Sequence, residues 1–117
     1  MAGKRPPKIP VRFYQTAAGR EPVPEWLRSL DREDRRAIGR DLALVQYGWP
    51  VGMPLVRSLG DGLWEVRSVV PGRRTARLIF CFAGSSIVVL HGFFKHTRKT
   101  QYEDLSLARQ RMREVKS

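Results

Sequence analysis

The sequence predicts an α+β fold: a twisted, mainly antiparallel sheet of four to five strands, with two N-terminal helices and one C-terminal helix against one face. The first observation is the stretch 63–97, whose runs LWEVRSVV, TARLIFCF and IVVLHGFFKHT hold the β-branched and aromatic residues that favour strands. The second is that segments with helical spacing of apolar residues precede and follow this stretch. The resulting order, β–α–α–β–β–β–β–α, is typical of an α+β domain.

The N-terminal third is expected to hold one strand and two helices. Residues 1–8 are basic and contain proline, so they are expected to form a disordered tail, whereas residues 9–16 alternate as a strand does. Because Pro10 has no N–H to donate, this strand is expected to start near Val11 or to lie at a sheet edge. A short helix is predicted from Pro24, whose missing N–H costs nothing in a first turn. Asp31 is suited to cap a second helix, which should continue to about Gln46. The apolar stripe of that helix consists of Ile38, Leu42, Val45 and Trp49.

Turn-forming residues separate the remaining elements. Residues 54–59 are expected to form a short strand, turned by the glycines at 60–62, and the pairs Pro71-Gly72 and Gly84-Ser85 divide the stretch 63–97 into three strands. A terminal helix follows, because apolar residues recur every three to four positions: Tyr102, Leu105, Ala108, Met112 and Val115.

The loop between the last two strands decides which residues share a face with Arg77. A two-residue turn would pair Arg77 with Gly92. A three-residue loop would pair it with His91 and would put it on the face of Phe93 and Lys95. The second arrangement is the one we expect.

Positive charge is the dominant feature of the composition, with a formal net charge of +11. The excess lies in residues 1–20 (+5), 57–94 (+3) and 95–117 (+4), while residues 21–56 carry −1. Such a distribution favours a polyanionic partner, nucleic acid above all. The alternative is a basic surface that only keeps the protein in solution.

Length and residue usage limit the class of protein. At 117 residues the chain is expected to form a single domain, 1–117. No apolar run approaches the ~20 residues of a membrane span, and the N-terminus lacks the apolar core of a signal peptide. The single cysteine, Cys81, fits a reducing compartment. We therefore expect a cytoplasmic protein that does not bind membranes.

The residues that could carry chemistry are cations within the strands. Two histidines and one cysteine without ligand spacing do not make a metal centre, and no known phosphate-binding loop is present, so neither a metal nor a cofactor is expected. The set that remains is Arg67, Arg77, Lys95 and His96, with Arg73, Arg74, Arg98 and Lys99 around it. RNA cleavage without a metal needs a base for the 2′-OH, cations for the charge on phosphorus, and an acid for the leaving oxygen. Arginine suits the phosphate, and histidine can exchange protons near neutral pH.

Each of these residues also has a structural interpretation. Arg67 could pair with Glu65 two residues earlier on the same strand face. Arg77 lies between apolar neighbours and is costly to bury, which favours a functional role. His91, inside its strand, is better interpreted as a hydrogen-bonded structural histidine, whereas Phe93 could stack on a base.

The chain resembles the RelE/HigB-like toxins of type II toxin–antitoxin systems, particularly the phage-related HigB-like branch. The resemblance runs from Leu55 to the C-terminus and rests on LWEVR (63–67), on RLIF (77–80) and on LHGFFKHTRKT (90–100). It implies a compact microbial-ribonuclease-like fold, endonucleolytic cleavage of mRNA, usually on the ribosome, and neutralisation by an antitoxin, expected to be of the helix-turn-helix type.

The resemblance also suggests which residues act. By position, Arg67, Arg77 and Lys95 match the basic active-site pattern of the family. The chain departs from the family at His96, where lysine is common, and at Gln101, where proline is common. The histidine could keep the site active with a different pH profile, or it could mark a site that has drifted.

The sequence thus predicts a metal-independent mRNA endoribonuclease. In this hypothesis Arg67 and Arg77 hold the scissile phosphate, and Lys95 or His96 transfers protons. RNA contacts are expected from Arg73, Arg74, Phe93, Arg98 and Lys99. The alternatives are an RNA- or ribosome-binding module without activity and a protein-interaction module on the same fold.

Overall fold

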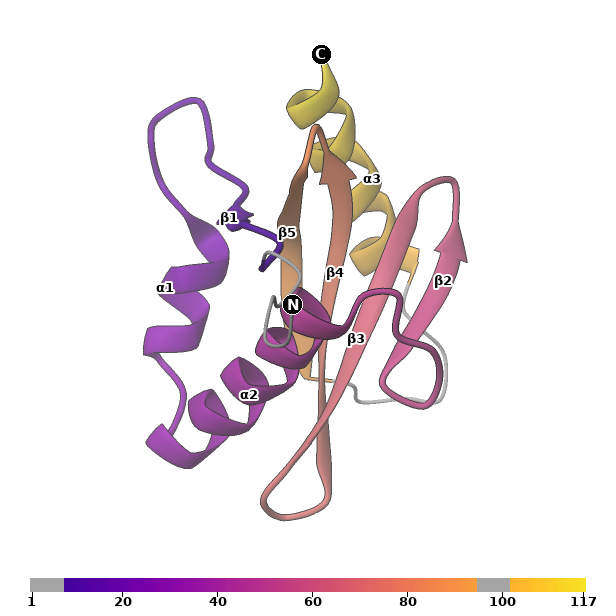
Figure 1. Cartoon of the computed structure of the whole chain (residues 1–117). Helices are drawn as coiled ribbons and strands as arrows, with labels where there is room; N and C mark the ends of the chain where they lie inside the picture. Colours follow the sequence, from indigo (N-terminus) through magenta and orange to yellow (C-terminus); the bar gives the residue numbers. More distant parts are fainter. Residues whose placement is uncertain (1–7, 95–101) are drawn as a thin grey trace.

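The structure, a computed structural model, describes residues 8–94 and 102–117, and it consists of one sheet with helices on both sides (Figure 1). Its elements are β1 (Val11–Phe13), α1 (Pro22–Arg28), α2 (Arg32–Gly48), β2 (Val56–Gly60), β3 (Leu63–Val70), β4 (Arg74–Ala83), β5 (Ser86–Phe94) and α3 (Tyr102–Lys116). The predicted order of elements is confirmed. Strand β1 begins at Val11 and lies at an edge of the sheet, as expected from the missing N–H of Pro10, but it ends at Phe13, before the predicted Thr16.

The five strands form a single mixed sheet in the order β1-β5-β4-β3-β2. The pairs β2–β3, β3–β4 and β4–β5 are antiparallel, as predicted. Strand β1 pairs with β5 in parallel, because the chain crosses over through α1 and α2 before it enters the rest of the sheet.

The helices cover both faces of the sheet, which corrects the expectation that they pack against one. Helices α1 and α2 lie on one face and α3 lies on the other (Figure 1). The physical reason is visible in β4, where residues 76–81 are all buried, so that both faces of this central strand need cover.

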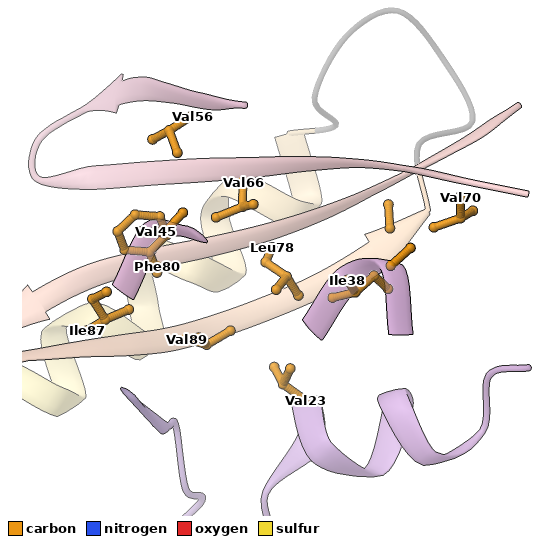
Figure 2. Packing of buried hydrophobic residues seen from close by; sticks show 12 residues of the cluster. Val23, Ile38, Val45, Val56, Val66, Val70, Leu78, Phe80, Ile87 and Val89 are labelled. Carbon is orange, nitrogen blue, oxygen red and sulfur yellow. The ribbon is translucent and has the colours of Figure 1, made fainter. Parts of the chain in front are cut away.

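The larger apolar core lies between the sheet and the helices α1 and α2. Figure 2 shows Ile38 and Val45 of α2 directed at Leu78 and Phe80 of β4, with Val23 of α1 at the end of the cluster. A smaller core lies under α3. Its buried members are Tyr14, Leu63, Ile79, Cys81, Val88, Leu90 and Ala108.

A β-bulge in β5 sets the register around Arg77. The hairpin has the two-residue turn that was not favoured, since Ala83 pairs with Ser86. The ladder then shifts by one residue at Leu90, so that Arg77 pairs with Phe93. Both predicted partners of Arg77 are therefore wrong, while the expectation that it shares a face with Phe93 is confirmed.

Candidate functional site

Arg67 and Arg77 lie directly opposite each other on β3 and β4, and Phe93 of β5 lies on the other side of Arg77. Residues that oppose each other across a sheet point to the same face. This is the α3 face, because the neighbouring Ile79 belongs to the core under α3. We call this part of the sheet the basic face. It consists of Arg57, Glu65, Arg67, Arg77, His91 and Phe93.

Arg77 is buried, with 1% of its surface exposed, and its Nη1 donates to Glu65 Oε2 at 2.9 Å. Glu65 is itself fully buried, and its other oxygen lies 3.5 Å from Nη2 of Arg57. A carboxylate at the centre of the face thus offsets the cost of burying the Arg77 guanidinium. The functional role expected for Arg77 stays a prediction.

Arg67 keeps access to solvent. It is half-buried, its backbone N–H donates to Leu55 O, and its Nε is buried without a hydrogen-bond partner among residues 8–94 and 102–117. Arg67 is also one of the residues that line a cleft of about 310 Å³, together with Asp41 of α2 and Leu55. The predicted pairing partner, Glu65, is engaged by Arg57 and Arg77.

Arg73 and Arg74, predicted to contact RNA, do not join the basic face. Arg73 is exposed in the turn between β3 and β4, with a φ of 60°. Arg74 lies on the α2 side, where its Nη2 donates to both carboxylate oxygens of Asp34 at 2.9 and 2.8 Å and its guanidinium stacks 5.0 Å from the Phe94 ring. Its role in this structure is to tie the hairpin to α2.

Four predicted site residues lie outside the described residues: Lys95, His96, Arg98 and Lys99. In the sequence, Lys95 and His96 directly follow Phe94, the last residue of β5. Their catalytic and RNA-binding roles stay predictions.

His91 has a hydrogen-bonded partner, as its structural interpretation requires. Its Nε2 lies 2.7 Å from Oδ1 of Asp104 in the first turn of α3, and its ring stacks on Phe93 at 5.1 Å. Asp104 was not predicted as a site residue, nor was Arg111, whose Nη1 donates to Leu90 O at 2.8 Å. No alternating pattern signalled these contacts, because residues 87–90 are all buried and residues 91–94 are all partly exposed.

The ionisable groups under α3 have shifted pKa values. Burial, followed by the hydrogen bond from its hydroxyl to Glu114, raises the pKa of Tyr14. Burial likewise raises the pKa of the Cys81 thiol, which makes it a poor nucleophile. Burial lowers the pKa of Arg111, whose guanidinium lies 4.9 Å from the Tyr14 ring.

The described parts of the chain contain neither a metal-binding cluster nor a helix that could span a membrane. Within residues 8–94 and 102–117, no three His, Cys, Asp or Glu side chains come together in a way that could hold a metal ion. Across the same ranges, no helix has both the length and the apolar character needed to cross a membrane.

The fold and the basic face together define a small α+β protein that carries a cluster of cations on one side of a mixed sheet. A family model described as phage-derived protein Gp49-like (DUF891) matches residues 25–113, well over half of the chain. The chain therefore belongs to the Gp49-like family, a family of toxin-like proteins. A comparison with curated proteins found no match.

Proposed function

We propose that this protein is the toxin of a toxin–antitoxin module and that it acts as a metal-independent mRNA endoribonuclease of the RelE/HigB type. The observation that carries the proposal is the side-by-side position of Arg67 and Arg77 on a sheet face whose next strand runs directly into Lys95 and His96. Membership of the Gp49-like family supports the toxin role. The net charge of +11 supports a nucleic acid as the substrate.

Because Arg77 is buried, the roles proposed for the two arginines differ from those that the sequence suggested. Arg67, half-buried and with Nε unpaired among the described residues, is the guanidinium that holds the scissile phosphate. Arg77 is fixed by Glu65 and acts as a positioning residue beneath it. Lys95 and His96 supply further positive charge and the proton that the leaving 5′ oxygen requires.

The partners follow from the same chemistry. The substrate is mRNA, bound on the ribosome in the cytoplasm, and the inhibitor is an antitoxin with acidic side chains that cover the basic face. RNA binding should weaken steeply with salt, because each phosphate that the protein neutralises releases counterions.

The test is induced expression followed by mapping of mRNA 5′ ends. We expect new 5′ ends with the wild type, and about 10²-fold less cleavage with Arg67→Ala or Lys95→Ala, since each would remove a donor to the transition state. Arg32→Ala is the matched control: it removes an exposed arginine at the start of α2, on the other side of the sheet. Intact mRNA in cells whose growth is arrested by the wild type would contradict the proposal.

A second candidate function is RNA or ribosome binding without cleavage. The observation in its favour is the buried Arg77–Glu65 pair, which removes one of the expected phosphate-binding cations. In that case Arg67→Ala would lower affinity for RNA while no cleaved transcript forms with either protein.

A further inference from the structure

The β-bulge at Leu90 determines which side chains of β5 reach the basic face. Before the bulge Cys81 pairs with Val88 and Phe80 with Val89; after it Ile79 pairs with His91 and Arg77 with Phe93. Without the extra residue, His91 would oppose Leu78 and would point to the face of α1 and α2. The bulge therefore turns His91 and Phe93 toward the basic face.

Helix α3 holds this bulge in place. Nη1 of Arg111 donates to the carbonyl oxygen of Leu90 at 2.8 Å, and thus satisfies a group at the point where the ladder is interrupted. One end of α3 then supplies Asp104, whose Oδ1 lies 2.7 Å from Nε2 of His91. Two contacts from one helix thus fix the position and the orientation of a single imidazole.

The partner of His91 determines which ring nitrogen can accept a proton. A carboxylate only accepts hydrogen bonds, so the neutral imidazole must carry its proton on Nε2, and Nδ1 has the lone pair. Nδ1 makes no hydrogen bond within residues 8–94 and 102–117. The side chains of His91 and Asp104 are 17% and 21% exposed, so the pair lies at the surface of the face and not inside the core.

We propose that His91, oriented by Asp104, is the general base of this site, a role that rests on the ribonuclease activity proposed above. Nδ1 takes the proton of the 2′-OH while the 2′ oxygen forms its bond to phosphorus. The bond from phosphorus to the 5′ oxygen breaks, and that oxygen takes a proton from the general acid of the function proposed above. The products are a 2′,3′-cyclic phosphate and a 5′-OH, and the His91 imidazolium returns its proton to water.

The geometry places this base at a useful distance from the phosphate-binding arginine. Phe93, Arg77 and Arg67 form a row across three strands. Along β5, His91 comes two residues before Phe93, which is roughly 7 Å. Arg67 is two strands away, roughly 10 Å across the sheet, a gap that its long side chain narrows. The charged groups that face the imidazole are Asp104 and Arg111 from α3, Arg77 from β4 and Glu65 from β3.

The experiment measures the rate of transcript cleavage by the full-length protein, in a translation reaction reconstituted with ribosomes, between about pH 5.5 and 8.5. For the wild type we expect a rate that rises with pH along a limb, because the base acts only after its imidazole has lost a proton. His91→Gln should lower the plateau about 10²-fold or more and abolish that limb. Asp104→Asn should move the limb to lower pH, because the imidazolium loses a stabilising negative charge. Glu103→Gln, which removes an exposed carboxylate from the same helical turn, is the matched control and should leave both rate and limb unchanged.

The outcomes separate this inference from the proposed function. If the wild type does not cleave RNA, both are overturned. If the wild type cleaves and His91→Gln keeps both its rate and its pH limb, only the role of His91 is overturned. Should His91→Gln fail to fold, as shown by its thermal melt, Asp104→Asn decides: an unshifted limb overturns the proposal, since a purely structural contact would not move it.

Discussion

The two faces of the sheet treat buried charge in different ways. On the α2 side, Asp34 binds Arg74, whose side chain is 47% exposed and reaches in from the edge of the molecule. On the α3 side, Glu65 and Arg77 are 0% and 1% exposed and lie in the middle of the sheet. The first pair fastens a hairpin to a helix, whereas the second is built into the strands themselves.

The two layers of helix also attach to the sheet differently. The α2 layer packs through apolar side chains such as Ile38 and Val45, which lie against Leu78 and Phe80 on one face of β4 (Figure 2). Helix α3 adds polar contacts to its smaller core: Tyr14 to Glu114, Arg111 to Leu90 and His91 to Asp104. The α2 face is therefore held mainly by apolar packing. On the α3 face, oriented polar groups replace part of that packing, as they do in functional sites.

The largest expected effect is at the buried pair. Glu65→Gln keeps the shape of the side chain but leaves Arg77 in the core without its counter-charge, so we expect a loss of about 3–5 kcal/mol in the free energy of unfolding. Asp34→Asn should cost only about 1 kcal/mol, because water reaches Arg74. Urea denaturation followed by circular dichroism measures both.

A double replacement sharpens this test. Glu65→Leu combined with Arg77→Met removes both charges and should recover most of the stability that Glu65→Gln loses. If Glu65→Gln costs no more than Asp34→Asn, the distinction between the two pairs is wrong.

The next effect concerns two glycines on the α2 side. A Cβ on Gly92 would lie 2.7 Å from the Trp26 ring of α1 and 2.9 Å from Leu78 Cδ2, so Gly92→Ala should destabilise by about 1–3 kcal/mol. Gly39 lies in α2 with nothing within 4 Å of such a Cβ, and Gly39→Ala should stabilise by about 0.5–1 kcal/mol. Thermal melts of the two variants should move in opposite directions. Two melts that both rise would contradict the tight packing of α1 on β5.

The sequence was informative about elements and weak about contacts between them. Runs of β-branched and aromatic residues, separated by turn-forming pairs, identified β3, β4 and β5 and placed Arg67 and Arg77 on successive strands. The burial of Arg77 was missed because Glu65 was considered as a partner on its own strand, whereas its contact is diagonal, across to β4.

The register and the side of α3 depend on contacts that no local pattern encodes. The bulge at Leu90 is held by Arg111, twenty-one positions away in the chain. Helix α3 covers the second face because β4 is buried on both sides. The pattern of a single strand does not tell which helix covers which side. The site was therefore predictable as a set of cations on neighbouring strands, but not as an arrangement.

The smallest expected effect tests whether the attachment of α3 depends on pH. Burial and the hydrogen bond to Glu114 raise the pKa of Tyr14 above its ordinary value of 10.0, so the folded protein holds this proton more tightly than the unfolded chain does. The contribution of this group to stability is complete below about pH 10 and is lost as the pH rises through the higher folded pKa. Tyr14→Phe should cost about 1 kcal/mol at pH 7, by loss of one hydrogen bond, and should lose less stability than the wild type between pH 9 and about 11.

Tyr47→Phe, which changes an exposed tyrosine on α2, is the control and should keep the pH dependence of stability that the wild type has. If Tyr14→Phe and the wild type lose stability in parallel above pH 10, the contact between Tyr14 and Glu114 does not fasten α3, and the contrast between an apolar and a polar attachment rests on Arg111 and Asp104 alone.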